Sequence, residues 1–161
     1  MTTTEYNSCV DLYADRVYRF IIKHTRNEAD ANDVVQNAFE VLWKNVSKIE
    51  FKKARAYLFS VAYNNMVDGF RKMKRINHVE TISEQAAVTR QTAPDLKSIL
   101  NQGLSRLSDI QRSVVLLRDY EGYSYKEIAK MVDLTETQVK VYIFRARKKL
   151  KSYLVSMDYV I

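Results

Sequence analysis

The sequence predicts an all-α protein with two small helical domains joined by a flexible linker, the second domain being a helix-turn-helix. Three Gly and one Pro among 161 residues leave little turn chemistry for β-hairpins. Apolar residues recur every three or four positions over most of the chain, which is the spacing of amphipathic helices. Three helix-start motifs lie close together in the last third of the chain. We therefore expect domains at residues 1–76 and 94–161, with the linker at 77–93.

The first domain is predicted to contain three helices, over Tyr6–His24, Glu28–Val46 and Ala54–Arg75. Each has one apolar stripe, so the three can bury a core together. Acidic residues gather in the first turn of the second helix and basic residues in the last turn of the third, as helix dipoles favour. The basic cluster therefore has a purely structural explanation beside any binding role.

Residues 77–93 are expected to form a linker because they are polar, lack sustained periodicity and run into Pro94. A fourth helix is predicted over Asp95–Leu107, and the helices of the second domain follow. Their reciprocal caps pair Ser108 with Gln111, Ser124 with Glu127, and Thr135 with Gln138. Gly122 supplies one turn, and Asp133 stands in the helix-turn-helix turn, where Asp tolerates a left-handed conformation better than most residues.

The last helix has an apolar stripe on one side and a polar, basic face on the other. The inward residues are Val139, Ile143, Ala146 and Leu150. The opposite face carries Glu136, Thr137, Lys140, Val141, Phe144, Arg145 and Lys148. We expect its N-terminal members to reach base edges in a major groove, and Arg145, Arg147, Lys148 and Lys149 to lie nearer the phosphates. A helical hairpin with a merely solvated basic face is the alternative, but spacing, capping and charge together favour DNA binding.

Charge is segregated along the chain, whose net charge is +7. Residues 1–50 have six Lys and Arg against eight Asp and Glu, residues 51–75 have seven against one, and residues 108–161 have ten against seven. Two basic zones suggest two contacts with a polyanion, and the acidic N-terminal part suggests a different partner. Charged faces that only aid solubility would explain the total but not the segregation.

Several classes of protein are disfavoured. Cys9 is the only cysteine, which excludes an intramolecular disulfide and a cysteine-based zinc site, and we expect it to be buried. The sequence has neither a signal-peptide pattern nor an apolar run near 18 residues, so a cytoplasmic location is expected. His24 and His78 are far apart and no glycine-rich phosphate loop is present, so we predict no enzyme, cofactor or metal site. His24 is expected at a helix C-terminus, interacting with the dipole.

Two motifs precede the helix-turn-helix: DANDVVQNAFEVLWK at Asp30–Lys44 and YLFSVAYNNMVDGFRK at Tyr57–Lys72. With them, nearly the whole chain resembles an RNA polymerase sigma factor of the sigma-70 family, of the small extracytoplasmic-function (ECF) type. The first motif is similar to the family's core-polymerase-binding helix, and the second to the helix that engages the −10 promoter element. The helix-turn-helix is similar to the domain that recognises the −35 element.

The resemblance implies a transcription initiation factor whose partners are the β′ and β subunits of core RNA polymerase, promoter DNA and an anti-sigma factor, often membrane-bound. The core-binding residues would be Asp30, Asp33, Gln36, Glu40 and Trp43. The −10-binding residues would be Lys52, Lys53, Arg55, Tyr57, Tyr63, Asn64, Asp68, Arg71, Lys72 and Arg75. The −35-binding residues would be Glu136, Thr137, Lys140, Val141, Phe144, Arg145, Arg147 and Lys148. Phe51, Tyr57 and Tyr63 could stack on unpaired bases or belong to the core, whereas Phe59 and Phe70 are expected in the core.

Two positions depart from the family pattern, because members often have basic residues where Tyr63 and Tyr142 stand. We therefore regard Tyr142 as the first place to look for altered promoter specificity. A helix-turn-helix repressor or activator that is not a polymerase subunit is the main alternative. It would explain the last helices but not the basic helix at Ala54–Arg75. An adaptor module is a third possibility and predicts no salt-dependent DNA binding.

Overall fold

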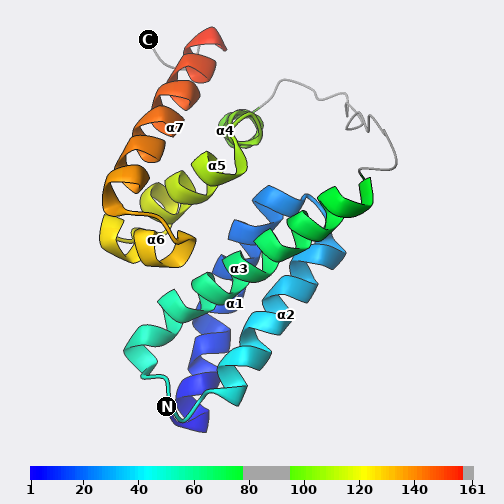
Figure 1. Cartoon of the computed structure of the whole chain (residues 1–161), viewed down its shortest axis with the longest axis vertical. Coiled ribbons are helices and arrows are strands. Elements are labelled where there is room, and N and C mark those ends of the chain that lie inside the picture. The colour runs from blue at the N-terminus through cyan, green and yellow to red at the C-terminus, as the bar shows by residue number, and fades with distance from the viewer. Residues whose placement is uncertain (78–94, 158–161) are drawn as a thin grey trace.

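The computed structural model describes residues 1–77 and 95–157, and every regular element in these ranges is a helix (Figure 1). The N-terminal helices are α1 (Thr3–Thr25), α2 (Glu28–Lys44) and α3 (Phe51–Asn77). The C-terminal elements are α4 (Leu96–Ser105), α5 (Asp109–Val115), the π-helical turn η1 (Leu116–Tyr120), α6 (Tyr125–Val132) and α7 (Glu136–Ser156). The all-α prediction is confirmed. The predicted linker lies outside the described residues except for Asn77, which ends α3.

The three N-terminal helices form a bundle whose limits differ slightly from the predicted ones. Helix α1 begins earlier than expected because Thr2 and Glu5 form a capping box. Helix α3 begins at Phe51, three residues before the predicted start at Ala54, so Lys52 and Lys53 lie in its first turn. The turn between α2 and α3 is held by the N-terminal ammonium, which donates to the carbonyl oxygens of Val46 and Ile49 at 3.0 and 3.2 Å.

The C-terminal helices begin where their caps predict, since all three capping boxes are formed. Gly122 and Asp133 adopt the left-handed conformation, with φ of 78° and 57°. The sequence did not predict η1, in which the Glu121 amide donates to the carbonyl oxygen of Leu116 five residues earlier. This wider turn ends directly before Glu121.

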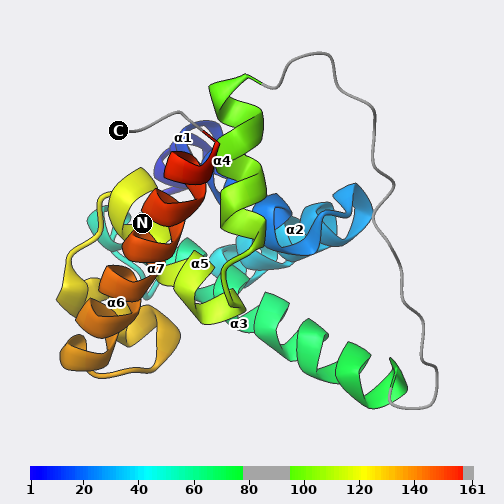
Figure 2. The same cartoon turned by 90° about the horizontal axis from the view of Figure 1, so that it is seen from above.

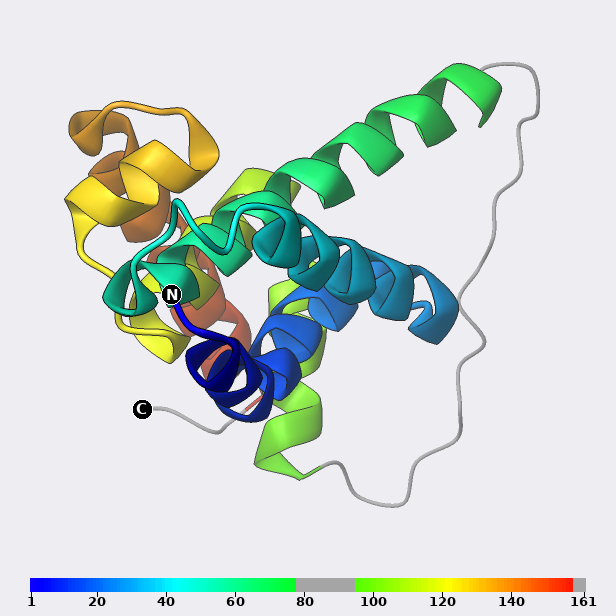
Figure 3. The ribbon, with the colours of Figure 1, turned by 90° about the horizontal axis from the view of Figure 1, so that it is seen from below.

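The two helical units pack directly on one another, which the sequence did not predict. Helix α1 contacts α4, and α3 contacts α6; Figures 2 and 3 show the C-terminal helices lying against the N-terminal bundle. The buried apolar residues of both units form one continuous cluster. Phe59 of the first unit and Tyr123 of the second meet there with ring centroids 5.4 Å apart. Cys9 and Phe59 are fully buried as expected, while Phe70 is only partly buried.

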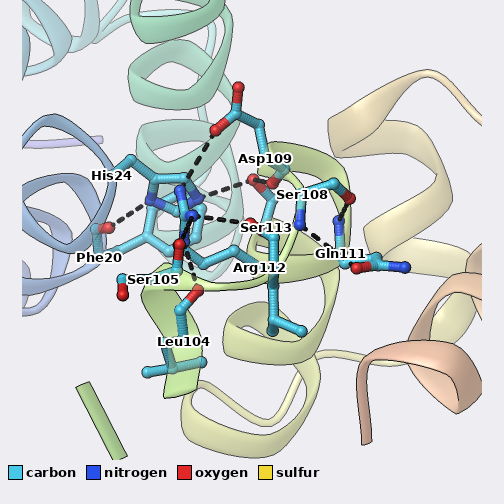
Figure 4. Close-up of polar contacts among 10 residues, drawn as sticks. Phe20, His24, Leu104, Ser105, Ser108, Asp109, Gln111, Arg112 and Ser113 are labelled. Atoms are coloured by element: carbon cyan, nitrogen blue, oxygen red, sulfur yellow. Dashed lines mark hydrogen bonds and ion pairs between the residues drawn. The ribbon is translucent and has the colours of Figure 1, made fainter. Parts of the chain in front are cut away.

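His24 lies in the last turn of α1, as expected, and it also joins the two units. Its Nδ1 lies 2.9 Å from the carbonyl oxygen of Phe20, and its Nε2 lies 2.9 Å from the Ser113 hydroxyl on α5 (Figure 4). Burial lowers the pKa of His24 to about 4, so the ring is neutral at physiological pH. Beside it, Arg112 is buried and donates to the carbonyl oxygens of Leu104 and Leu107.

Candidate functional site

The predicted core-binding residues form one exposed stripe along α2. Their spacing of three or four positions places them on the same side of the helix. Asp30, Asp33, Gln36 and Glu40 are all exposed, and the Gln36 amide donates to the Glu40 carboxylate at 3.4 Å. Trp43 ends the stripe; it is 49% exposed and its ring contacts Tyr6 with centroids 5.0 Å apart. The stripe is therefore acidic and polar, with one accessible indole at its end.

A second exposed stripe runs along α3 and gathers most of the residues predicted to bind the −10 element. At about 100° of rotation per residue, one face of the helix presents Lys53, Tyr57, Asn64, Asp68, Arg71 and Arg75. All of these are exposed except Tyr57, which packs partly against the core. No carboxylate in the described part of the chain lies within ion-pair distance of Arg71, Lys72 or Arg75. Their charges are free to meet a polyanion.

Arg55 and Tyr63 lie away from that stripe. Arg55 is on the opposite side of α3, where its guanidinium pairs with Glu121 of the second unit at 3.6 Å. Tyr63 is half-buried, and burial raises the pKa of its phenol. Helical periodicity alone places both residues off the stripe, and packing against the second unit accounts for the partner of Arg55. The structure does not bring these two residues together with the other predicted −10 contacts.

The third exposed surface belongs to α7, the second helix of the helix-turn-helix. The residues exposed on it are Glu136, Thr137, Lys140, Val141, Phe144, Arg145 and Lys148. Phe144 is 68% exposed, although phenylalanine is usually buried. Arg147 is also exposed but is engaged by Asp119, whose Oδ2 accepts from its Nε at 2.9 Å, and this hydrogen bond raises the pKa of Arg147.

Tyr142 does not share this exposed face. It is half-buried and packs against the apolar core, next to the inward stripe of α7. A side chain held there cannot extend into a groove as the neighbouring Lys140 can. The hypothesis that Tyr142 is the first determinant of altered specificity therefore finds no support in its position.

Other residues at the contact between the units could not be found from sequence. Arg16 of α1 and Glu121 form an ion pair at 3.0 Å, although more than one hundred residues separate them in the sequence.

A hollow of about 410 Å³ lies between α1 and α4. Its lining includes the cations Arg19, Lys23, Arg26 and Lys97 together with Ile22, Asn101 and Leu104. Among these, Lys23 is sufficiently buried that desolvation lowers its pKa.

Comparison with known proteins agrees with this layout. Sigma-70 region 2 matches residues 9–76, which span α1 to α3, and Sigma-70 region 4 matches residues 98–150, which include α5 to α6 and most of α7. The chain belongs to the sigma-70 family of RNA polymerase sigma factors. The region 4 match is the part that contains the helix-turn-helix, and the two matches follow in the order expected from sequence.

Two relatives of similar length are ECF sigma factors. The chain is 27% identical over 146 residues to the ECF RNA polymerase sigma factor SigM of Bacillus subtilis, covering 88% of this chain and 90% of SigM. It is 29% identical over 149 residues to SigL of Mycobacterium tuberculosis, covering 88% and 84% of the two chains. These relatives favour a sigma factor over the alternative, a repressor or activator that is not a polymerase subunit. Sigma factors are transcription initiation factors and not enzymes.

The fold is also that of a solved sigma factor. The sigma factor RpoE, solved in complex with the anti-sigma factor NepR from Bartonella quintana, superposes with a TM-score of 0.80. The match covers 94% of this chain and 98% of RpoE at 22% identity. No helix within the described residues is both long and apolar enough to cross a membrane.

Proposed function

We propose that this sigma factor binds core RNA polymerase through α2, engages the −10 promoter element through α3 and recognises the −35 element through α7. The observation that carries the proposal is the presence of three exposed, chemically distinct stripes on these three helices. Only the α2 stripe is acidic, and the α3 and α7 faces carry unpaired cations. This difference in charge favours a basic partner for the α2 stripe and a polyanion for the α3 and α7 faces.

The α2 stripe fits a basic surface of the polymerase β′ subunit. Asp30, Asp33 and Glu40 supply negative charge, which steers association and fixes the register of the contact. Trp43 supplies an apolar anchor, the kind of side chain that contributes most at interfaces. A contact with the β subunit is proposed on the family resemblance alone.

The α3 stripe fits a strand separated from the promoter duplex. Lys53, Arg71 and Arg75 can neutralise phosphates along it, while Tyr57 offers an aromatic edge on the same face. Stacking of one extruded base on an aromatic side chain is worth about 1–3 kcal/mol. Such stacking would offset part of the cost of unpairing the −10 element.

The α7 face fits the major groove of the −35 element. Glu136, Thr137 and Lys140 lie in its first turns, where the recognition helix of this motif contacts base edges. Arg145 and Lys148 follow further along and are placed for phosphate contacts. The helix-turn-helix therefore has separate parts for base recognition and for anchoring.

The binding of Asp33→Lys to core polymerase tests the first part of the proposal. Reversing this exposed charge should weaken association by about tenfold or more, because a rim charge that met a basic surface now repels it. Asp11→Lys is the matched control, since Asp11 is exposed on α1 away from the stripe. Fluorescence titration of labelled sigma factor with core enzyme gives both constants. Equal affinities for the two variants would contradict the assignment of α2.

We further infer that an anti-sigma factor regulates the protein in the cytoplasm, as the NepR complex of RpoE suggests by analogy. The hollow between α1 and α4 suits an acidic inhibitor segment, because its charged lining residues are all cations. Lys97→Glu should therefore weaken inhibitor binding and leave core binding unchanged. Attachment of that inhibitor to a membrane stays a prediction from the family resemblance.

A further inference from the structure

Glu121 ties the two helical units together. Its Oε2 lies 3.0 Å from Nη2 of Arg16 and 3.6 Å from Nη2 of Arg55, and the Glu121 backbone oxygen also accepts from Arg55. The Glu121 side chain is only 10% exposed. Two guanidinium groups from different helices thus converge on one carboxylate in a partly dehydrated site, where salt screens charges less than at the surface.

Two buried polar atoms beside this contact weaken it. The Tyr123 ring packs on Phe59 and lies 4.7 Å beneath the Arg55 guanidinium. The Tyr123 hydroxyl and the Arg55 Nε are both buried, and neither has a hydrogen-bond partner among the described residues. Unsatisfied buried polar atoms oppose the packing that buries them, because separation of the units would return them to water. The charges of Glu121 therefore add to the apolar packing that joins the units, whereas these buried polar atoms oppose it.

The dimensions of promoter DNA require the contact to open. Elements centred near positions −10 and −35 are about 25 base pairs apart, or about 85 Å at 3.4 Å per base pair. A compact protein of 161 residues has a diameter of about 40 Å, from the scaling of the radius of gyration. The two units joined by one apolar core form such a body. In this arrangement α3 and α7 cannot reach both elements at once.

We propose that Glu121 is an internal latch: through Arg16 and Arg55 it keeps the −35-binding unit closed on the −10-binding unit, and the chain opens there to engage a promoter. This inference rests on the proposed function only in taking the open chain to be the form that engages a promoter. It gives Arg55 a role between the units in place of the phosphate contact expected from sequence. The π-helical turn η1 contributes by ending directly before Glu121 and directing it toward α1 and α3.

Single-molecule FRET on the free full-length chain tests the latch directly. Dyes are attached at Ser47→Cys and Ser152→Cys, both exposed positions, while the native Cys9 is fully buried and stays unlabelled. The parent chain should populate mainly a high-transfer state. Glu121→Gln should lower the ratio of closed to open molecules about fivefold, since a partly exposed ion pair is worth about that factor. Asp11→Asn, which neutralises an exposed carboxylate on α1, should leave the ratio unchanged.

Arg16→Gln provides a second variant that leaves the η1 turn intact. It should open the chain to a similar extent, and combining it with Glu121→Gln should add little, because both changes remove the same ion pair. A ratio of closed to open molecules that is the same for Glu121→Gln, Arg16→Gln and the parent would overturn the latch. Circular dichroism of each variant confirms that its helices are intact.

Transcription with core polymerase separates this inference from the proposed function. If neither the parent nor the variants initiate transcription, the sigma factor function is refuted. The latch is still supported in that case, provided that the variants open in FRET. A parent that initiates from a promoter while Glu121→Gln stays closed would refute the latch alone. With both correct, Glu121→Gln should reach half-maximal transcription at a lower concentration of sigma factor.

Discussion

Truncation of Phe144 to alanine should separate stability from promoter recognition. The ring is 68% exposed on α7, so only about a third of it is removed from water. Full burial of a phenylalanine is worth about 1.5–3 kcal/mol, which limits the loss of folding free energy to about 1 kcal/mol. If the ring contacts base edges or thymine methyl groups, promoter affinity should fall by about 1–3 kcal/mol, or about fivefold to more than a hundredfold.

The assay pairs thermal unfolding of the free chain with titration of a fluorescent promoter duplex by the holoenzyme. Leu12→Ala is the control, because Leu12 is 53% exposed on α1 and its truncation should cost a similarly small amount of stability without changing promoter affinity. Phe59→Ala is the opposite control, since this fully buried ring should cost about 3–5 kcal/mol of stability. Parent-like promoter affinity for Phe144→Ala would refute the view that the exposed face of α7 contacts DNA bases.

Three other predictions concern pH, backbone conformation and the division of α7. The pKa of His24 is about 4 in the folded chain and about 6.5 in the unfolded chain. The free energy of unfolding should therefore fall by up to about 3 kcal/mol between pH 6.5 and 4. Urea titrations at several pH values should show a smaller fall for His24→Gln. Gly122→Ala should destabilise the fold by about 1 kcal/mol because φ at this position is +78°. Gly69→Ala within α3 should instead stabilise it by about 0.5–1 kcal/mol, and thermal unfolding measures both changes. Lys140→Ala should change the preferred −35 sequence, whereas Lys149→Ala should weaken all sequences evenly and reduce the salt dependence; equal behaviour would contradict the division.

Local features of the fold could be predicted because their causes lie within a few residues. The capping boxes at Ser108, Ser124 and Thr135 need partners only three positions away, and all three are formed. The left-handed conformation of Asp133 follows in the same way from the turn that contains it. The exposed stripes on α2 and α7 were predictable as well, since helical periodicity alone determines which residues share a face.

Contacts between distant segments could not be predicted, and they changed the interpretation of individual residues. Arg55 belongs to a basic segment in sequence, yet its partner Glu121 comes from the other unit. His24 meets Ser113 on α5, a contact that no local pattern indicates. No residue pattern identified in the sequence marks the π-helical turn η1. The domain limits and the individual binding residues stay predictions.

Transcription in vitro tests the central claim most directly. Purified chain is added to core RNA polymerase on fragmented genomic DNA, and the 5′ ends of the transcripts are mapped. We predict new start sites that depend on the added chain and share two upstream elements near positions −10 and −35, with less transcription from them for Asp33→Lys. Transcription that is identical with and without the chain would contradict the account.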